Sequence, residues 1–118
     1  MASKAILVTG CAGFIGSNFV RQFKKEFPKT KIVGIDDFST GRKENIEALR
    51  PAQGIKNFIF YKGSILDEKL LEKIFSKHRP EYVFHFAALP RVSYSLERPY
   101  KTTLVNVTGT IALLEKAA

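Results

Sequence analysis

Four short runs of apolar residues divide the chain at regular intervals. They are AILVTG (5–10), KIVGID (31–36), FIFYKG (58–63) and YVFHFA (82–87). Each run is rich in β-branched or aromatic residues and is bounded by glycine, proline or charge. Because their apolar residues follow one another without regular alternation, the runs are typical of parallel strands buried on both faces. The pattern predicts a four-stranded parallel sheet.

Helical patterns lie between these runs. After the first run, three apolar residues recur at helical spacing and predict one buried face: Ile15, Phe19 and Phe23. Phe27-Pro28 is expected to end this helix, because proline cannot continue one. The segment 43–53 has a weaker pattern, which predicts a short helix that ends near Pro51.

Two further helices are expected in the second half of the chain. One follows Asp67, a residue type that caps helix N-termini. Its apolar face is predicted to consist of Leu70, Leu71, Ile74 and Phe75. The last helix is predicted from a stripe made of Leu104, Val107, Ile111 and Leu114.

Strands that alternate with helices at this spacing predict an α/β fold, a Rossmann-type parallel sheet with right-handed crossovers. A doubly wound dinucleotide-binding fold normally has about six strands, whereas this sequence supplies four. Residues 1–118 are therefore expected to supply only part of such a sheet.

The formal net charge of +8 is a feature shared with nucleic-acid-binding proteins. The lysines are scattered over predicted helix faces and turns, so we expect a solvated basic surface and no nucleic-acid partner. The apolar runs are too short to span a membrane, and the start lacks the long apolar stretch of a signal peptide. A single cysteine cannot form an internal disulfide, which is consistent with the expected cytoplasmic location.

Three glycines at intervals of three stand between the first run and the first helix: Gly10, Gly13 and Gly16. In a dinucleotide-binding turn, the first would permit a tight turn and the second would let a pyrophosphate approach the backbone. The third would let the helix pack close to the sheet, and the phosphates would lie at its positive end. The spacing differs from the usual Gly-x-Gly-x-x-Gly, so a turn without a ligand stays open as an alternative.

Asp36 ends the second run, where an acidic side chain can accept hydrogen bonds from the 2′- and 3′-hydroxyls of a ribose. A 2′-phosphate would be repelled there, which favours NAD over NADP. The alternative is a solvated acid at a strand end. Spacing alone leaves Asp37 unassigned, because adjacent side chains of a strand point in opposite directions.

Two residue types invite a catalytic interpretation that we do not favour. Cys11 is expected to be a small side chain packed in a crowded turn rather than a nucleophile. His85 lies in an apolar strand and is expected to be packed rather than to act as an acid or a ligand. With two histidines and one cysteine in the chain, no metal site is predicted.

Five segments together resemble a known family in order and spacing. They are VTGCAGFIGSN, GIDDFSTG, GSILD, HFAALPRVSYSLERP and NVTGTIALLE. The resemblance is to the N-terminal half of the extended short-chain dehydrogenases, the NAD-dependent epimerase/dehydratase family, and among these the UDP-hexose 4-epimerases are most alike. It covers nearly the whole chain. It implies the strand order 3-2-1-4, with helices on both faces of the sheet. It also implies that residues 1–118 form the N-terminal part of an NAD(P)-binding Rossmann domain, with the rest of that domain and a substrate domain absent from this sequence.

The resemblance also implies an NAD site spread over most of the chain. The implied cofactor-binding residues are Gly10, Gly13, Phe14, Ile15, Gly16, Asp36, Asp37, Ser39, Thr40, Gly41, Ser64, Ile65, Phe86, Ala87, Ala88, Pro90 and Asn106. Two residues are implied to contact the sugar, Arg91 and Ser93. The family usually has Asp where Ser64 stands, so the contact with the adenine amino group is not carried over to this chain.

By the same resemblance, the parent protein is an enzyme that uses NAD to oxidise a UDP-hexose transiently at C4. A 4,6-dehydratase or decarboxylase of the same family is the alternative, and a non-catalytic dinucleotide-binding module is an alternative of another class. The family's base is the tyrosine of Tyr-x-x-x-Lys. None of Tyr61, Tyr82, Tyr94 and Tyr100 has Lys four residues later. No catalytic residue is therefore assigned, and the chain alone is expected to be inactive and to self-associate through its fourth strand.

Overall fold

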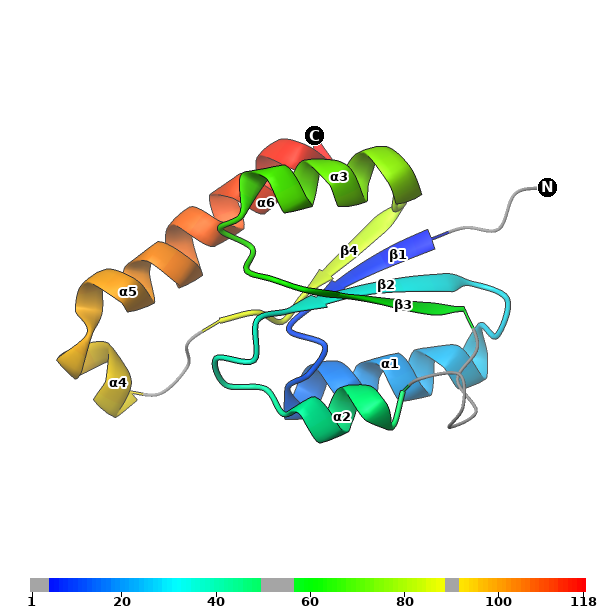
Figure 1. Cartoon of the computed structure of the whole chain (residues 1–118), viewed down its shortest axis with the longest axis horizontal. Helices are drawn as coiled ribbons and strands as arrows, with labels where there is room; N and C mark the ends of the chain where they lie inside the picture. Colours follow the sequence, from blue (N-terminus) through cyan, green and yellow to red (C-terminus); the bar gives the residue numbers. More distant parts are fainter. Residues whose placement is uncertain (1–4, 50–56, 89–91) are drawn as a thin grey trace.

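A parallel sheet with the strand order β3-β2-β1-β4 forms the centre of the computed structural model, which describes residues 5–49, 57–88 and 92–118. Figure 1 shows α1 and α2 on one side of this sheet and α3 and α6 on the other. The elements, in chain order, are β1 (Ala5–Thr9), α1 (Phe14–Glu26), β2 (Lys31–Asp36), α2 (Lys43–Glu47), β3 (Phe58–Lys62), α3 (Glu68–His78), β4 (Tyr82–His85), α4 (Val92–Glu97), α5 (Pro99–Thr103), the π-helical turn η2 (Leu104–Thr108) and α6 (Gly109–Ala117). The predicted fold class and strand order are confirmed.

The central strand β1 explains the continuous apolar runs. Leu7 of β1 pairs with Val33 of β2 on one side and with Val83 of β4 on the other. Alternate side chains of a strand point to opposite faces. Ile6 and Val8 therefore enter the core on the α1 and α2 side of the sheet, and Leu7 enters the core on the α3 and α6 side. All five residues of β1 are buried, as expected for a strand covered on both faces.

Helix α1 follows the prediction except at its start. Phe19 and Phe23 pack against the core on the α1 and α2 side of the sheet. The ring centroid of Phe19 lies 4.6 Å from that of Phe84 on β4. The helix ends at Glu26, directly before Phe27-Pro28, as predicted. Ile15, however, is 66 % exposed, so its expected place on the buried face is wrong. The first turn of α1 borders a surface pocket instead of the sheet.

Helix α3 confirms its sequence signals. The Asp67 carboxylate accepts a 3.1 Å hydrogen bond from the backbone N–H of Leu70 and so caps the helix. Leu71 and Ile74 are fully buried in the core on the α3 and α6 side of the sheet, and Leu70 and Phe75 pack against this core. Helix α2 is shorter than predicted, since it ends at Glu47. The expected boundary at residue 51 lies outside the described residues.

The last helical segment is present as predicted, and most of its large apolar stripe lies at the surface. Val107, Ile111 and Leu114 are 52 %, 51 % and 64 % exposed. The buried face instead includes Val105, Gly109, Ala112 and Leu113. A Cβ at Gly109 would lie only 2.6 Å from Cδ1 of Ile65, so small residues let α6 approach the neighbouring loop closely.

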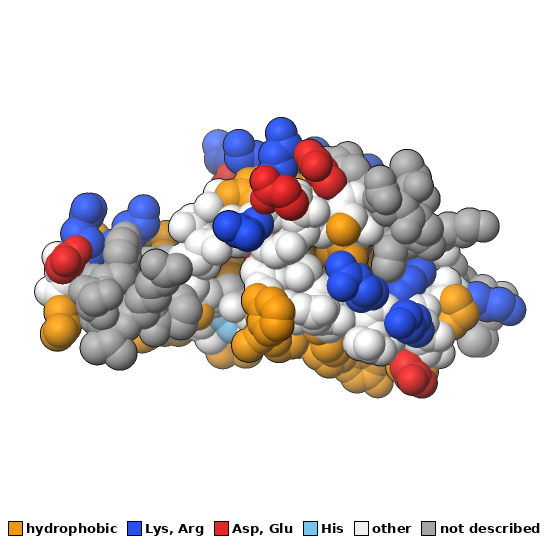
Figure 2. All heavy atoms as spheres, turned by 90° about the horizontal axis from the view of Figure 1, so that it is seen from below, with side chains coloured by type: hydrophobic (Ala, Val, Ile, Leu, Met, Phe, Trp, Pro, Cys, Tyr) orange, Lys and Arg blue, Asp and Glu red, His pale blue; other side chains and the backbone are white. Residues whose placement is uncertain are grey.

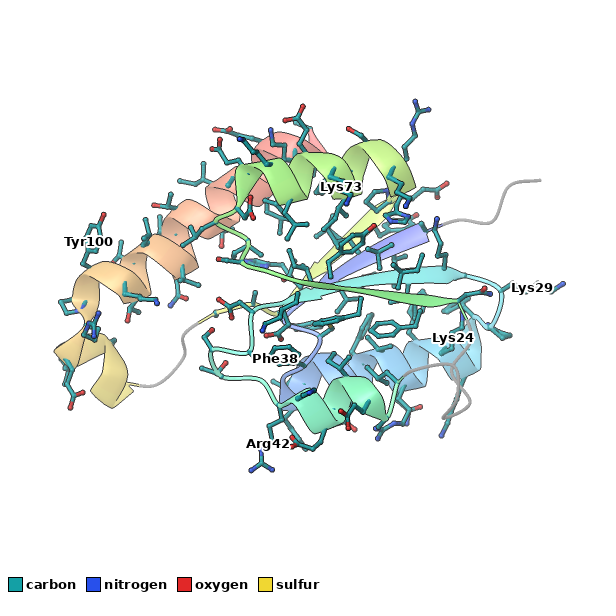
Figure 3. The ribbon with its side chains drawn as sticks, viewed as in Figure 1. Lys24, Lys29, Phe38, Arg42, Lys73 and Tyr100 are labelled. Atoms are coloured by element: carbon teal, nitrogen blue, oxygen red, sulfur yellow. The ribbon has the colours of Figure 1, made fainter. Side chains whose placement is uncertain are left out.

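In the described parts of the chain, Lys24 is the one buried residue among the Lys, Arg, Asp and Glu side chains. Figure 2, which views the α1 and α2 side, shows Lys and Arg dispersed over this face, whereas hydrophobic side chains gather along one edge. Lys24 is buried, and its Nζ donates to the backbone carbonyl of Thr30. Figure 3 shows its position at the far end of α1, away from Arg42 and Tyr100. Among the described helices, none is long and apolar enough to cross a membrane.

Candidate functional site

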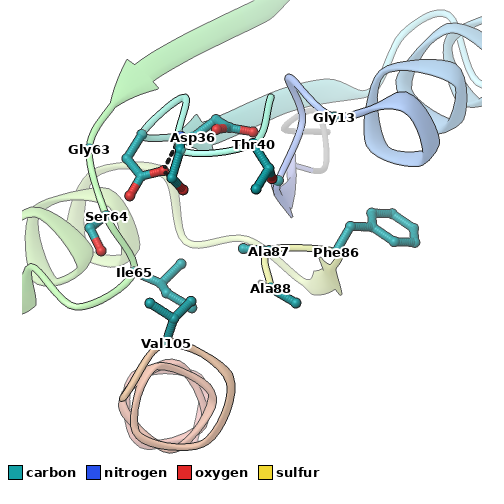
Figure 4. A pocket seen from close by; sticks show the side chains of 13 residues that line it. Gly13, Asp36, Thr40, Gly63, Ser64, Ile65, Phe86, Ala87, Ala88 and Val105 are labelled. Carbon is teal, nitrogen blue, oxygen red and sulfur yellow. Dashed lines mark hydrogen bonds between the residues drawn. The ribbon is translucent and has the colours of Figure 1, made fainter. Parts of the chain in front are cut away.

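The carboxyl ends of the four strands meet at one edge of the sheet, and the loops after them enclose a pocket (Figure 4). The lining residues are Gly10 and Gly13 after β1; Asp36, Asp37, Ser39 and Thr40 after β2; Gly63, Ser64 and Ile65 after β3; Phe86, Ala87 and Ala88 after β4; and Val105 from η2. This edge of an open parallel sheet is where ligands of such folds bind.

A second hollow adjoins the first over the start of α1. It adds Phe14, Ile15 and Gly16, and it shares five residues with the pocket: Gly10, Gly13, Thr40, Phe86 and Ala88. The two hollows therefore form one continuous candidate site, which reaches from the end of β3 to the N-terminus of α1.

The structure brings together most of the residues expected from the sequence. Gly41 and Asn106 line neither hollow. Pro90 and Arg91 lie outside the described residues, and Ser93 belongs to α4 with no described side chain. Sequence reasoning missed Gly63 and Val105. Gly63 directly follows the third apolar run, a position that could have indicated it, whereas Val105 lies beside the stripe chosen for the last helix.

The three glycines of the first turn differ in what the chain itself requires of them. Gly10 has a φ of +71°, and a Cβ there would lie 2.7 Å from the backbone nitrogen of Ala87. A Cβ at Gly16 would collide with the backbone carbonyl of Gly10. A Cβ at Gly13 would meet only that same carbonyl oxygen, at 3.3 Å. The fold therefore requires glycine least at position 13. This favours the interpretation that Gly13 leaves room for a ligand.

The N-terminus of α1 opens on the same place. Gly13 is its N-cap residue, no side chain caps the helix, and no acidic residue stands in the first turn. The positive end of the helix dipole and its first backbone N–H groups are thus not neutralised by a side chain of the helix. This arrangement suits a phosphate group.

Asp36 lines the pocket and accepts hydrogen bonds from two backbone donors. Its Oδ2 accepts from Ala12 N at 2.9 Å, and its Oδ1 accepts from Phe38 N at 2.7 Å. Each carboxylate oxygen keeps a lone pair for a further donor. Burial raises the pKa of Asp36 above its ordinary value, the two N–H donors lower it, and the charge of Asp37 raises it.

Asp37 also lines the pocket, because β2 ends at Asp36 and the chain turns directly after it. Its Oδ1 accepts hydrogen bonds from the backbone N–H of Ser39 at 2.9 Å and from the Ser39 hydroxyl at 2.6 Å. The alternation of side-chain directions along a strand left Asp37 unassigned in the sequence. That alternation does not apply to Asp37, because β2 ends at Asp36.

Figure 4 shows how the remaining walls are arranged. Ile65 and Val105 extend toward each other on one side of the pocket, and Ala87 and Ala88 lie on the facing side. These side chains make an apolar channel next to the polar end that Asp36 occupies. A ligand with both a polar and a flat apolar part would match this division.

The residues that invited a catalytic interpretation are placed as packed groups. Cys11 is fully buried, and burial raises the pKa of its thiol, so it stays protonated. His85 is half-buried and hydrogen-bonded to Thr9 and Thr110. Among the residues that the structure describes, no group of three His, Cys, Asp or Glu side chains could hold a metal ion.

Comparison with known proteins places this arrangement among nucleotide-sugar enzymes. A family model described as GDP-mannose 4,6 dehydratase matches residues 7–118. The chain is 43 % identical over 112 residues to the dTDP-D-glucose 4,6-dehydratase of Dictyostelium discoideum, a match that covers 93 % of the chain and 25 % of the relative.

Solved structures give the same picture. The UDP-glucose 4-epimerase of Thermotoga maritima, determined with UDP-glucose, is 43 % identical with a TM-score of 0.82, over 96 % of this chain and 33 % of that one. The UDP-glucose 4-epimerase of Brucella ovis, determined in complex with NAD, is 33 % identical with a TM-score of 0.80, over 97 % of this chain and 32 % of that one. The chain thus spans between a quarter and a third of the length of these relatives.

Proposed function

The chain belongs to the NAD-dependent epimerase/dehydratase family, and from this premise we propose that it binds NAD as the N-terminal part of the Rossmann domain of a longer nucleotide-sugar enzyme. The family resemblance in the sequence is confirmed by the match over residues 7–118. The role proposed for this chain's own residues rests on the geometry of the pocket.

One observation carries the proposal: Ala12 of the glycine turn is hydrogen-bonded to Asp36. The turn suits a pyrophosphate and Asp36 suits a ribose, and these two groups are neighbours in a dinucleotide. A single hydrogen bond thus holds the two recognition elements side by side in one pocket.

The residues present fit NAD along its length. The pyrophosphate would lie on the backbone of Gly13, Phe14 and Ile15, where glycine leaves room and the helix N-terminus is uncapped. The adenosine ribose would lie at Asp36 and Asp37. The further residues proposed for the ribose side are Ser39, Thr40 and Gly41, and those proposed for the adenine are Ser64 and Ile65.

The nicotinamide would lie at the loop after β4, in the hollow that Phe86 and Ala88 line together with the start of α1. When bound, NAD supplies reversible hydride acceptance at a sugar carbon. Phe86, Ala87 and Ala88 would orient the ring, with Pro90 and Asn106 as further proposed contacts. The apolar walls would exclude water from that hollow. Arg91 and Ser93 stay our proposed sugar contacts.

For the parent protein we propose epimerisation at C4 of a UDP-hexose, in line with the likeness to epimerases such as that of Thermotoga maritima. The 4,6-dehydratase alternative is kept, because the family model and the Dictyostelium relative carry that description. Both activities require the cofactor site described above, so the N-terminal region serves either.

Two measurements test the proposal. Calorimetric titration of the full-length protein should show saturable NAD binding, and a protein that binds no NAD would refute it. Incubation with UDP-glucose and with dTDP-glucose then separates the activities by mass spectrometry and sugar analysis. An isomeric hexose of unchanged mass indicates the epimerase, and a product that has lost water indicates the dehydratase. NAD binding with neither product would support the non-catalytic module.

A further inference from the structure

A series of side-chain hydrogen bonds runs beneath the apolar end of the pocket. His85, the last residue of β4, lies between Thr9 at the end of β1 and Thr110 in the first turn of α6. Its Nδ1 is 2.6 Å from Oγ1 of Thr9, and its Nε2 is 2.9 Å from Oγ1 of Thr110. The Thr110 hydroxyl in turn donates a 2.7 Å hydrogen bond to the backbone carbonyl of Asn106 in η2.

The protons of this series can be assigned from its ends. Oγ1 of Thr9 accepts from the backbone N–H of Ala87 at 3.1 Å and shares the N–H of Phe86, at 3.0 Å, with the Thr9 carbonyl oxygen, at 3.1 Å. With these N–H groups directed at its lone pairs, the hydroxyl has its own proton to donate to Nδ1 of His85. At the other end Thr110 donates its proton to a carbonyl, so it accepts from Nε2–H. All partners are satisfied by the neutral imidazole with its proton on Nε2.

We propose that His85, as a neutral Nε2-protonated imidazole bridging Thr9 and Thr110, is a positioning residue that sets the spacing between the two walls at the apolar end of the pocket. This inference rests on the proposed NAD-binding function. One wall is the loop Phe86–Ala88, whose first two residues donate backbone N–H hydrogen bonds to Oγ1 of Thr9. The other is η2, which is tied to Thr110.

The local structure supports this assignment. His85 does not line the pocket, but the next three residues do, and Val105 faces them from η2. A π-helical turn such as η2 is rare and is often found at functional sites. Burial lowers the pKa of His85, which keeps the imidazole in the neutral form that the hydrogen bonds require.

The first test reads the tautomer directly and needs no ligand. In the full-length protein labelled with ¹⁵N at histidine, the His85 resonances are identified with the variant His85→Asn. At neutral pH we expect an unprotonated Nδ1 and a protonated Nε2. An imidazole protonated on Nδ1, or on both nitrogens, would overturn the proposal.

The second test cuts one bridge and leaves the shape unchanged. Thr110→Val removes the hydroxyl that accepts from His85 and donates to Asn106 O, and we expect NAD affinity to fall about fivefold, because the link between the two walls is lost. Thr110→Ser keeps the hydroxyl and should restore affinity. Thr102→Val is the matched control, because the Thr102 hydroxyl makes the same type of bond to the carbonyl four residues earlier, at 3.0 Å from Arg98 O, on exposed α5.

The outcomes separate this inference from the proposed function. Wild-type affinity in Thr110→Val, or equal losses in Thr110→Val and Thr102→Val, would overturn the positioning role. A wild-type protein that binds no NAD would refute the proposed function. In that case, the amide resonances of Phe86–Ala88 decide whether the walls are coupled. A shift in Thr110→Val but not in Thr102→Val supports the coupling, and unchanged resonances overturn it.

Discussion

The backbone N–H of Ala12 donates a 2.9 Å hydrogen bond to the Asp36 carboxylate, across 24 positions of sequence. Through this bond the turn after β1 holds the acid at the end of β2. Asp36 also accepts from Phe38 N, so its orientation is determined before any ligand arrives. Preorganisation of this kind lowers the entropic cost of binding.

We predict that Asp36 determines the choice of cofactor. A carboxylate at the ribose 2′ position repels a 2′-phosphate, so the wild-type protein should bind NAD more tightly than NADP. Asp36→Asn should remove most of this preference, because the charge is lost. Glu26→Gln, at the exposed far end of α1, removes one charge away from the site and should leave the preference unchanged. Fluorescence titration of the wild type and of each variant with NAD and with NADP measures the preference. Tighter binding of NADP than of NAD by the wild type would contradict the assignment.

We predict that Gly13→Val blocks the pyrophosphate and spares the fold. Gly13 has an extended backbone with φ −77°, which valine adopts readily, and its Cβ would meet only the Gly10 carbonyl oxygen at 3.3 Å. NAD affinity should fall by more than about tenfold, or 1.4 kcal/mol, with little change in the unfolding midpoint.

Gly10→Val provides the contrast for this prediction. Its φ of +71° and the 2.7 Å approach to Ala87 N make any side chain costly there. Circular dichroism should therefore show that Gly10→Val unfolds at lower temperature than Gly13→Val. Unchanged NAD affinity in Gly13→Val would show that the glycines serve only the turn itself.

We predict that the 118-residue chain self-associates when it is prepared alone. In the described parts of the chain no strand pairs with the outer edge of β4, and exposed edges pair with other chains. Tyr82 on this strand is 61 % exposed and Ile111 on α6 is 51 % exposed. Sedimentation velocity should show dimers or larger species. Tyr82→Lys combined with Ile111→Lys should shift them toward monomer, and Leu96→Lys, on α4, should not.

A monodisperse, folded monomer of the unaltered chain would contradict this prediction. The same preparation allows a second measurement: the chain alone should not convert UDP-glucose, because none of its tyrosines begins a Tyr-x-x-x-Lys sequence.

We predict that the stability of the chain falls as the pH is lowered below about 6.5. Burial lowers the pKa of both His78 and His85 from the ordinary histidine value of 6.5. Between the folded and unfolded pKa values the unfolded state binds more protons, so the free energy of unfolding rises with pH there. Each histidine contributes at most about 1.4 kcal/mol per pH unit.

Urea unfolding at several pH values between neutral and about pH 5 checks this expectation. His85→Asn should reduce the slope and leave the part due to His78. A free energy of unfolding that stays level or rises on acidification through this range would contradict it.

Local chemistry along the sequence was enough to predict much of this protein. Continuous apolar runs predicted the buried parallel strands, because a strand covered on both faces has no polar side. Asp67 predicted the start of α3 through a bond to a residue three positions away. The glycine turn and Asp36 were placed at strand ends, and parallel strands bring such ends to one edge of the sheet.

The tertiary structure alone decided which face of the last helix is buried. Ile111 and Leu114 are exposed, whereas Gly109 and Leu113 are buried, and a Cβ at Gly109 would lie only 2.6 Å from Cδ1 of Ile65. The same packing brings Thr110 to His85, a contact between residues 25 positions apart. Helical spacing predicts which residues share one face of a helix. Whether that face packs against the neighbouring element depends on the distance between the two elements, which only the tertiary structure gives.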